Sequence, residues 1–594
     1  MTRHLELPKQ PALPYPVEVL ANPSQDELRA LALEHTPHCV RTARGSLNKV
    51  ARNKARMAAF TYIIDRRGEP ELYSHKTISP ADAQVLIDGQ RAYIEDRGTL
   101  LLIDGYVGLG PRAVPVQWCY TLEGANIAGM QQILSFPRAR VEGEAAAKQP
   151  FVPAFRLVYT PDYFVDMPGR QAIVVDLDNY VTYIMGPDYF GESKKGALRM
   201  LAEFHYRNGG LVMHAGAKVI HIGDKHLTMG ILGLSGTGKT TTTFSKQGNS
   251  TKPVQDDMIT LWPGGEISVT ENGCFAKTFG LAEAAEPVIY RGTLSPEAWV
   301  ENVYLDDKDE PDFFKRTLEP ADVARMREVL IGTGAPEANV DAYISGAVTR
   351  ESVVEDGIPK DGWDFVMWSE NGRSIIPMSS VEDAADLDTL PAVYSLGILN
   401  RDEGDEAATP GLVRFTSPEQ AAGYLMLGET SKTSAAGKDR GKTRSPFTQP
   451  FFPLAHGNQA ERFSELAATF SGTTMWLMNT GYVGGDAAGV KTGAALKVKI
   501  RHSSAMLEAM VEDRIVWTID PDFGYEVVDI QDPANAALLA KVPTEILRPS
   551  VFFSARSRGD DYAQWVAKMK RERTAFLERW KVAPAIVAAV ENAN

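Results

Sequence analysis

The chain has 594 residues, of which 44% are hydrophobic and 23% are charged, a globular composition that excludes disorder as its main state. With 62 Lys and Arg against 76 Asp and Glu, the formal net charge of −14 offers no overall positive field, so a dedicated nucleic-acid-binding protein is not expected. The three cysteines, Cys39, Cys119 and Cys274, lie far apart and predict neither a disulfide scaffold nor a zinc ribbon.

The N-terminal segment is rich in proline and is predicted to lie extended on the surface. Its prolines come before any apolar stretch, and no apolar run reaches about 18 residues, so we expect a cytoplasmic protein without a membrane partner. The first helix is expected to begin at Ser24, because Ser24 and Glu27 have the spacing of a capping box. Leu28, Leu31 and Ala32 then form an apolar stripe.

The pattern changes to short β-rich runs separated by Gly, Pro and Asp between about residues 99 and 222. The runs at 100–103, 172–175, 181–185 and 219–222 predict a mixed sheet. A helix is expected over about 192–207, and Gly209 and Gly210 are expected to end it. We place a domain boundary at this point, which gives domains at 1–210 and 211–594.

Several later segments stand out by their charge or their apolar spacing. The acidic stretches at 306–312 and 402–411 are predicted to be solvated loops, because they are too polar to pack. The basic segment at 432–444 suits either a phosphate-bearing ligand or a plain solvated loop. A helix over about 561–580 is expected to pack through Trp565, Met569 and other apolar side chains at three- to four-residue spacing.

The strongest motif is GLSGTGKT at residues 233–240, which follows the apolar run 227–232 and matches the phosphate loop GxxxxGK[ST]. In such a loop, glycines let backbone N–H groups surround phosphate oxygens. Lys239 would reach the β/γ oxygens, and the Thr240 hydroxyl could ligate Mg²⁺. A glycine-rich turn without chemical meaning is the alternative.

Groups that could hold a metal lie on both sides of this loop. Downstream, Asp256 and Asp257 follow a short predicted strand, where paired carboxylates suit Mg²⁺ or Mn²⁺ beside a nucleotide. Upstream lie the Lys194 and Lys195 pair and His214, which could instead be a solvated face and a core residue. A lysine ligates a metal only when neutral, and an adjacent lysine helps to lower its pKa.

These residues together resemble the ATP-dependent phosphoenolpyruvate carboxykinases. The resemblance runs from about residue 95 to about 580 and rests on motifs in family order and spacing. They are YFGESKKG (189–196), MHAG (213–216), GLSGTGKTT (233–241), the pair Asp256 and Asp257, GCFAKTF (273–279), AEPVIY (285–290), NGRSIIPM (371–378), TSPEQAAGY (416–424) and MNTGYVGG (478–485).

The resemblance implies an enzyme that converts oxaloacetate and ATP into phosphoenolpyruvate, CO₂ and ADP, with Mn²⁺ and with Mg²⁺ carried by ATP. It implies an α/β fold in two domains, an N-terminal mixed-sheet substrate-side domain and a C-terminal P-loop nucleotide- and metal-binding domain, with the active site in the cleft between them. It leaves the oligomeric state open.

The resemblance also implies roles for particular residues. The catalytic groups would be Lys194, Lys195, Lys239 and Arg373, and the substrate would be bound by Arg44, Tyr189, Lys195 and Arg373. The metal ligands would be Lys195, His214, Asp257 and Thr240. ATP would be bound by Gly233, Leu234, Ser235, Gly236, Thr237, Gly238, Lys239, Thr240, Thr241, Glu286, Arg373, Arg440 and Gly441.

The chain departs from the family pattern at four places. Met258 and the three residues after it replace the usual Glu-His-Gly-Trp that follows the paired aspartates. The N-terminal substrate arginine could be Arg44 or Arg41, and the segments that start at Arg440 and at residue 397 differ from the usual ones. Two further hypotheses therefore stand beside the carboxykinase: a P-loop kinase for another small acceptor or a protein, and a nucleotide-binding regulatory protein.

Overall fold

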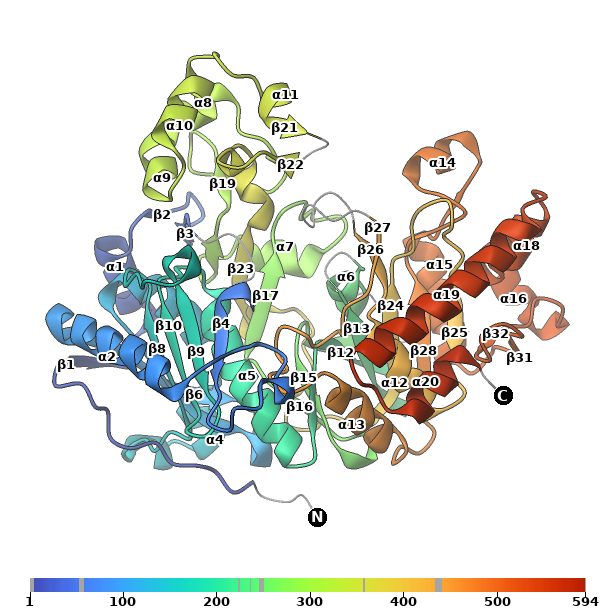
Figure 1. Cartoon of the computed structure of the whole chain (residues 1–594), viewed down its shortest axis with the longest axis horizontal. Coiled ribbons are helices and arrows are strands. Elements are labelled where there is room, and N and C mark those ends of the chain that lie inside the picture. Colours follow the sequence, from blue (N-terminus) through green and yellow to red (C-terminus); the bar gives the residue numbers. More distant parts are fainter. Residues whose placement is uncertain are drawn as a thin grey trace. The chain divides into compact units, whose positions relative to one another are not determined.

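The computed structural model describes residues 5–52, 58–222, 225–234, 237–244, 250–355, 358–432 and 441–592. The chain divides into two compact units, each of which is interrupted in sequence. Unit 1 consists of Met1–Phe204 and Thr270–Ala384, and unit 2 of His205–Val269 and Ala385–Asn594. Each unit contains both sheets and helices, so the predicted α/β class is confirmed (Figure 1).

This division differs from the expected single boundary at residue 210, with domains at 1–210 and 211–594. The chain crosses between the units near residues 204, 269 and 384. Thr270–Ala384 returns to unit 1 because its strands share a sheet with strand β3, Leu47–Lys49. Pairing between strands about 250 residues apart leaves no trace in the local sequence pattern.

The larger sheet of unit 1 is mixed, as predicted, with the strand order β1-β6-β7-β8-β10-β9-β4-β5. β6 and β7 are antiparallel, whereas β7 and β8 are parallel. The predicted runs at 100–103, 172–175 and 181–185 lie within β6, β9 and β10. The strands are β1 Glu18–Ala21, β4 Thr61–Ile64, β5 Lys76–Ile78, β6 Thr99–Val107, β7 Val114–Tyr120, β8 Phe155–Thr160, β9 Ala172–Asp176 and β10 Val181–Met185.

The smaller sheet of unit 1 has the order β17-β23-β18-β3-β2. Its remaining strands are β2 Cys39–Arg41, β17 Gly273–Lys277, β18 Trp299–Glu301 and β23 Arg373–Pro377. Two hairpins belong to the same unit, β19 Tyr304–Leu305 with β20 Pro311–Asp312, and β21 Val354–Glu355 with β22 Ile358–Pro359. Residues 307–309, in the acidic stretch predicted to be solvated, form the exposed turn of the first hairpin.

The helices of unit 1 include the predicted first helix, α1 Gln25–His35, whose N-cap is Ser24 with both capping-box hydrogen bonds to Glu27. The predicted 192–207 helix is α5 Gly191–Arg207, and Gly209 follows it with a φ of +90°. The others are α2 Pro80–Arg97, α3 Ala125–Leu134, α4 Arg138–Glu142, α7 Pro287–Thr293, α8 Pro320–Arg325, α9 Arg327–Gly332, α10 Glu337–Ile344 and α11 Arg350–Val353. Helices α8 to α11 surround a separate small core, drawn yellow-green in Figure 1.

The main sheet of unit 2 has the order β14-β12-β13-β24-β28-β25-β32-β31 and is also mixed. Its strands are β12 Ala215–Ile222, β13 Lys225–Gly233, β14 Ser250–Gln255, β24 Val393–Asn400, β25 Leu412–Arg414, β28 Thr474–Asn479, β31 Trp517–Ile519 and β32 Glu526–Val528. Smaller sheets join β11 Leu211–Met213 to β15 Ile259–Leu261 and β16 Ile267–Val269, β26 Thr430–Lys432 to β27 Gly441–Thr443, and β29 Tyr482–Val483 to β30 Leu496–Lys497. The run at 219–222, expected in one sheet with the runs at 100–103, 172–175 and 181–185, lies instead in β12 of this sheet, and the runs at 227–232 and 252–255 lie within β13 and β14.

Helix α15 of unit 2 packs against this main sheet and buries apolar side chains of it. Met506 and Met510 of this helix pack in a core cluster with Ile231 and Trp476 of the sheet. The predicted C-terminal helix is α19, in which Trp565 and Met569 are buried. The helices are α6 Lys239–Phe244, α12 Pro418–Leu427, α13 Gly457–Ala467, α14 Ala487–Thr492, α15 Ile500–Val511, α16 Ala536–Leu539, α17 Thr544–Leu547, α18 Pro549–Ser554, α19 Gly559–Arg579 and α20 Pro584–Glu591.

The prediction that 402–411 is a solvated loop is wrong. Asp402, Ala407 and Ala408 are each no more than 1% exposed. The segment packs because the carboxylate of Asp402 accepts hydrogen bonds from the backbone N–H groups of Ala408 and Thr409 and from the Thr409 hydroxyl. An acidic side chain can be buried when its oxygens are satisfied in this way.

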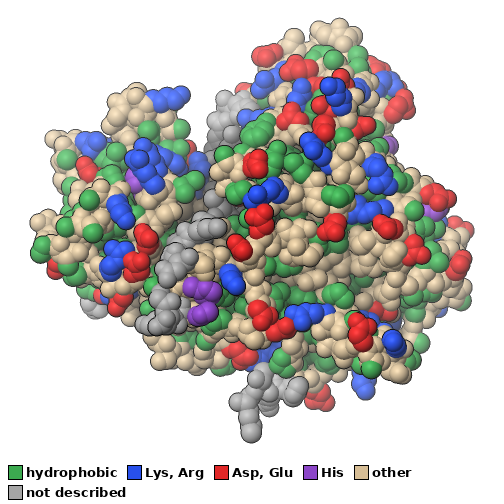
Figure 2. Space-filling model, turned by 180° about the vertical axis from the view of Figure 1, so that it is seen from behind, with side chains coloured by type: hydrophobic (Ala, Val, Ile, Leu, Met, Phe, Trp, Pro, Cys, Tyr) green, Lys and Arg blue, Asp and Glu red, His purple; other side chains and the backbone are tan. Residues whose placement is uncertain are grey.

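The charge of the chain is distributed over its surface. On the face shown in Figure 2, acidic and basic side chains are interspersed rather than gathered by sign.

The cysteines Cys39, Cys119 and Cys274 are free thiols. Of the helices within the described ranges, none combines the length and the apolar character that crossing a bilayer requires.

Candidate active site

The glycine-rich loop 233–240 lies between a buried strand and a helix of unit 2. β13 ends at Gly233, and α6 begins at Lys239. A Cβ at Gly233 would lie 2.4 Å from Thr237 Oγ1, and Gly238 has a φ of +92°, so both positions require glycine. Strand, tight turn and helix start therefore follow one another as in a phosphate-binding loop.

Hydrogen bonds at Thr237 hold the loop in place. Its hydroxyl donates to the carbonyl of Leu234 at 2.7 Å, and its own carbonyl accepts a hydrogen bond from the hydroxyl of Thr480 at 2.9 Å. Thr480 directly follows β28, so the loop is tied to the end of another strand of the same sheet. The other predicted ATP-binding residues of the loop are Ser235 and Gly236, which lie outside the described residues, and Thr240 and Thr241, which follow Lys239 in α6.

Asp257 brings two predicted site residues together in unit 2. It follows the end of β14, and its Oδ1 lies 2.7 Å from Lys239 Nζ and 2.9 Å from His214 Nε2. Its neighbour Asp256 is buried, with 3% of the residue exposed. One carboxylate thus contacts both the lysine of the phosphate loop and the predicted metal-binding histidine.

His214, between β11 and β12, has an oxygen atom beside each of its ring nitrogens. Its Nδ1 lies 3.2 Å from the carbonyl oxygen of Phe447, and its ring packs against Phe451. Both partner atoms are acceptors, so a neutral ring that donates Nδ1–H to the carbonyl has its Nε2 lone pair facing the Asp257 carboxylate, an arrangement that a cation bound by both atoms would stabilise. A metal-binding histidine commonly has this arrangement, since a backbone carbonyl fixes its tautomer.

The donor atoms at this point suit a divalent metal ion. Imidazole nitrogen and carboxylate oxygen are ligands that Mn²⁺ accepts. In the part of the chain that the structure describes, no group of three or more His, Cys, Asp and Glu side chains could hold a metal by itself. Lys195, in unit 1, stays a predicted further ligand of this metal.

The lysine pair begins helix α5 in unit 1 and is not a solvated face. Lys194 Nζ lies 3.0 Å from Glu271 Oε1, and Lys195 Nζ lies 2.7 Å from Glu192 Oε1. Burial alone would raise the pKa of Glu192, but Lys195 and Arg199 outweigh it and lower the pKa to about 2. Both lysines are therefore placed by buried carboxylates rather than by water.

Three of the predicted site residues of unit 1 surround one aromatic ring, that of Phe275. Lys194 Nζ lies 5.2 Å and Arg373 Cζ 5.9 Å from the centre of this ring, and the Tyr189 ring centre lies 6.4 Å away. Lys195 Nζ lies over the Tyr189 ring at 5.5 Å. Burial raises the pKa of Tyr189, while the charge and the hydrogen bond of Arg373 oppose the shift. We call these five residues the Phe275 cluster.

Lys277 extends the positive charge of this cluster. It lies opposite Arg373 across the pairing of β17 with β23 and two residues after Phe275, so it shares their face of the sheet. Burial and the neighbouring charge of Arg373 both lower the pKa of Lys277. Phe275 and Lys277 both stand in the motif GCFAKTF, which indicates the family. Their i, i+2 spacing within a strand could have predicted that both side chains lie on the same face as the site.

The structure does not bring Arg44 to the Phe275 cluster. Its side chain is 51% exposed in the turn between β2 and β3, and its Nε pairs with Glu310 at 2.8 Å. The alternative, Arg41, donates to the backbone carbonyl of Gly45 at 3.1 Å. Glu286 caps the start of helix α7 in the same unit.

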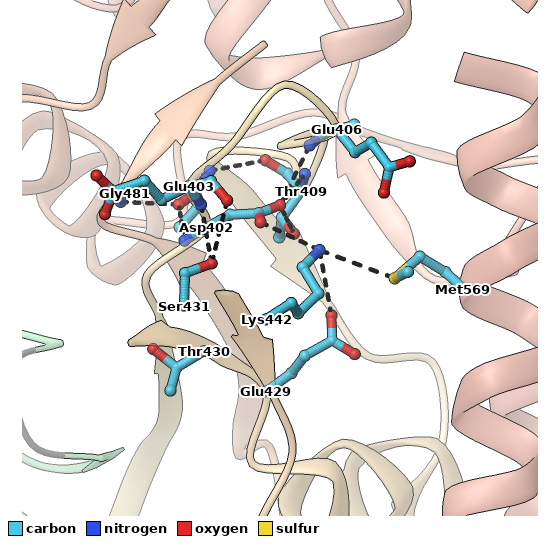
Figure 3. Close-up of polar contacts among 12 residues, drawn as sticks. Asp402, Glu403, Glu406, Thr409, Glu429, Thr430, Ser431, Lys442, Gly481 and Met569 are labelled. Atoms are coloured by element: carbon cyan, nitrogen blue, oxygen red, sulfur yellow. Dashed lines mark hydrogen bonds and ion pairs between the residues drawn. The ribbon is translucent and has the colours of Figure 1, made fainter. Parts of the chain in front are cut away.

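The basic segment 432–444 is engaged in ion pairs where it is described. Arg440 lies outside the described residues, and Gly441 begins β27. Lys442 Nζ lies 3.1 Å from Asp402 Oδ1 and 3.8 Å from Glu429 Oε1, next to Met569 of α19 (Figure 3). Arg444 pairs with Glu429 at 2.9 Å. Lys442 and Arg444 are therefore neither solvated nor unpaired, in contrast to both alternatives for this segment.

Glu429 also binds a cation from helix α19. Arg573 Nε and Nη2 each lie 3.0 Å from its carboxylate oxygens, and Arg573 Nη1 lies 3.1 Å from the Tyr424 hydroxyl. Burial alone would raise the pKa of Glu429, but Arg573 and Lys442 hold it well below its ordinary value. The two segments that depart from the family pattern, at 397–413 and 440–451, are therefore joined to each other and to α19 by buried charges.

Comparisons with known proteins identify the family of the chain. A family model described as phosphoenolpyruvate carboxykinase matches residues 17–324 and 337–533. The chain is similar to proteins named phosphoenolpyruvate carboxykinase (ATP) from several organisms. That of Afipia carboxidovorans is 28% identical over 462 residues, which are 75% of this chain and 72% of the relative. That of Thermus thermophilus is 25% identical over 71% of this chain and 68% of the relative, and that of Geobacillus thermodenitrificans is 24% identical over 84% and 81%.

Proposed function

The chain belongs to the phosphoenolpyruvate carboxykinase (ATP) family, and we propose how its residues carry out the reaction of that family. It is an ATP-dependent carboxy-lyase, which converts oxaloacetate and ATP into phosphoenolpyruvate, CO₂ and ADP. The C–C bond to the leaving carboxylate breaks, its electron pair forms the enolate, and the enolate oxygen takes the γ-phosphoryl group from ATP. The observation that supports our assignment most directly is the contact of Asp257 with both Lys239 and His214.

The residues of unit 2 bind the triphosphate. We assign the loop from Gly233 to Thr241 to the phosphates, with Lys239 at the β/γ oxygens, because its ammonium group lies at the start of α6 beside Asp257. Developing negative charge on the transferred group is stabilised by fixed cations. The residues predicted for the adenosine side are Arg440 and Gly441, and Glu286, at the start of α7, is predicted to lie near the nucleotide.

We assign a divalent metal ion to His214 and Asp257, with Lys195 as a further ligand and Mn²⁺ as the metal, while Mg²⁺ accompanies ATP at Thr240. The donor atoms fit this assignment, since Nε2 of His214 and Oδ1 of Asp257 lie 2.9 Å apart. A metal bound there supplies positive charge for the enolate oxygen.

The residues of unit 1 bind the carboxylate substrate. Arg373 offers a planar pair of donors that can bridge carboxylate and phosphate oxygens, and the Tyr189 hydroxyl, hydrogen-bonded to it, fixes its direction. Lys194 also lies near the Phe275 ring, 5.2 Å from its centre, and adds positive charge. Arg44 stays a proposed substrate ligand, which would first have to leave Glu310.

The other hypotheses have less support. A P-loop kinase for another acceptor would not need the cationic groups of the Phe275 cluster, and a regulatory protein without turnover would not need a metal site beside Lys239. We propose that the protein is cytoplasmic and that its partners are oxaloacetate, phosphoenolpyruvate, CO₂ and adenine nucleotides.

The test of this function is a direct assay with oxaloacetate, ATP, Mg²⁺ and Mn²⁺ that follows phosphoenolpyruvate and ADP together. We expect the two products in equal amounts. ADP without phosphoenolpyruvate would indicate a kinase or an ATPase, and no ADP under any metal condition would indicate a regulatory protein.

A further inference from the structure

The smaller sheet of unit 1 aligns charged side chains in a single row. Lys277 of β17 pairs with Arg373 of β23, Arg373 with Glu301 of β18, and Glu301 with Lys49 of β3. Directly paired residues project from the same face of a sheet, with Cβ atoms about 4.5–5.5 Å apart. Glu301 is thus a carboxyl group between two cations, and one of them is the proposed substrate-binding arginine.

Glu301 is buried without full hydrogen bonding. It is 1% exposed, and its Oε1 accepts a hydrogen bond from the backbone N–H of Phe190 at 3.1 Å. Its Oε2 has no hydrogen-bond partner among the described residues. An ionised carboxylate with a buried unpaired oxygen is costly, so the site favours the protonated form.

The charged and titratable neighbours of Glu301 do not reverse the preference of the site for the protonated carboxyl. Burial raises the pKa of Glu301 to about 8, and Asp188 adds to the rise, while the Phe190 N–H, Lys49 and Arg373 oppose it. Lys49 is already engaged by Asp188, at 3.2 Å. The facing phenols, Tyr189 and Tyr159, have raised pKa values because they are buried, so both are neutral near pH 8.

Arg373 is not neutralised by an acid within the described part of the chain. Its described contacts are the carbonyl of Gly372, the Tyr189 hydroxyl and the ring of Phe275. A protonated Glu301 therefore leaves the full positive charge of Arg373 to an incoming carboxylate. An ionised Glu301, on the neighbouring strand, would attract the same guanidinium.

We propose that Glu301 is a positioning residue whose protonation determines whether Arg373 is available to the substrate. In the neutral form it leaves Arg373 free to bind the oxaloacetate carboxylate, and in the ionised form it pairs with Arg373 and competes with the substrate. This proposal deepens the proposed function, because it depends on Arg373 as a substrate ligand.

The proposal makes a quantitative statement about the Michaelis constant. If only the protonated form binds substrate, the apparent affinity falls in proportion to the protonated fraction. With a pKa of about 8, KM for oxaloacetate should rise by about tenfold between pH 7 and pH 9, while kcat changes little.

The test is the pH profile of KM and kcat in the parent protein, Glu301→Gln, Glu301→Asp and the control Glu297→Gln. Glutamine imitates the protonated carboxyl, so Glu301→Gln should keep the activity at pH 7 and lose the alkaline rise in KM. Glu301→Asp retains a titrating group and should keep the rise. Glu297 is exposed and precedes the same strand, so Glu297→Gln should behave as the parent.

Several outcomes would overturn the proposal. A KM for oxaloacetate that stays constant from pH 7 to pH 9 in the parent protein would overturn it. A KM that still rises with pH in Glu301→Gln would also overturn it. Loss of the rise in both Glu301 variants would indicate a structural role alone. If the parent makes no phosphoenolpyruvate at any pH, the proposed function fails instead.

Thermal unfolding gives a readout that does not depend on activity. The pKa of the Glu301 carboxyl is about 8 in the folded chain, against an ordinary 4.5. The free energy of unfolding of the parent protein therefore decreases as the pH rises from 4.5 to 8. Glu301→Gln lacks this loss, so its Tm relative to the parent should increase from pH 5 to pH 8. A Tm difference that is independent of pH would contradict a protonated Glu301.

Discussion

Asp257 is the single residue on which the unit 2 part of the site depends most. Its carboxylate contacts Lys239 at 2.7 Å and His214 at 2.9 Å, which joins the phosphate loop to the proposed metal site. The family resemblance grouped His214 with Asp257 in one predicted metal site, and the motif spacing placed Lys239 in the phosphate loop. The sequence could not predict that one oxygen serves both, since that contact joins positions 43 residues apart.

The residues that sequence reasoning missed have weak local signals. Glu301 ends a strand of three residues and resembles any surface acid until its pairing with Arg373 is known. Phe275 stands in a motif that identifies the family, but nothing in the motif says that three site residues surround its ring. Arg44, chosen from a motif resemblance alone, lies instead in an exposed pair with Glu310.

Replacing Lys239 should remove phosphoryl transfer. For Lys239→Ala we expect phosphoenolpyruvate formation to fall by at least about 100-fold, because a fixed cation that stabilises the transferred group is lost. Metal-dependent decarboxylation of oxaloacetate should persist in part, since the lysine acts on phosphate. Separate assays of CO₂ and phosphoenolpyruvate measure the two effects. Lys252→Ala, an exposed lysine of β14, is the control, and a Lys239→Ala rate near that of this control would show that the loop is structural.

Replacing His214 should weaken the metal site without removing the nucleotide site. For His214→Ala we expect the affinity for Mn²⁺ to fall by at least about tenfold, because one of the proposed ligands is lost. Electron paramagnetic resonance titration of free Mn²⁺ measures the affinity directly. The control is His35→Ala at the end of α1, which should bind as the parent does. An unchanged affinity in His214→Ala would return this histidine to a core role.

At the scale of elements, helices were predicted better than packed polar segments. The start of α1 follows from the capping box at Ser24, and the buried side of α19 follows from its apolar spacing. The 402–411 segment was mistaken for a solvated loop because composition alone cannot show that Asp402 is satisfied by its own backbone and by Lys442.

The ion pairs around Glu429 should contribute strongly to stability. Arg573→Met keeps the apolar volume but removes one partner of a buried pair, which costs about 3–5 kcal/mol. Urea unfolding measures the loss, and Arg571→Met, an exposed residue on the same helix, is the control and should change little. Equal midpoints for the two variants would contradict a buried pair at this position.

The loss of unfolding free energy in Arg573→Met should depend on pH in a definite direction. Because Arg573 and the other cations hold the pKa of Glu429 below its ordinary 4.5, the stability that the carboxylate contributes is present above that pH and is lost as the pH falls. The difference in unfolding free energy between Arg573→Met and the parent should therefore shrink in acid. A difference that grows below pH 4.5 would show the opposite sign of the shift.

At the scale of the whole molecule, the sequence predicted the fold class and the reaction but not how the chain is divided. The resemblance extends over most of the chain because its motifs occur in order, and that order is preserved even where the chain passes from one unit to the other. The return of Thr270–Ala384 to unit 1 depends on strand pairing with residues near position 48, which only a three-dimensional structure reveals. The motif GCFAKTF therefore falls in unit 1, although it follows the phosphate loop in sequence.

The proposed reaction requires groups from both units to act on one substrate, and variants combined across the units test this. Arg373→Lys in unit 1 and His214→Asn in unit 2 should each lower kcat/KM, Arg373→Lys by about 2–5 kcal/mol in transition-state stabilisation. Residues that act as a unit are not additive, so the double variant should lose clearly less than the product of the two single losses. Arg373→Lys combined with the exposed Arg571→Met should lose no more than Arg373→Lys alone. Single losses that multiply in the double variant would mean that the two residues act independently, and the assignment of both to one reacting centre would then be wrong.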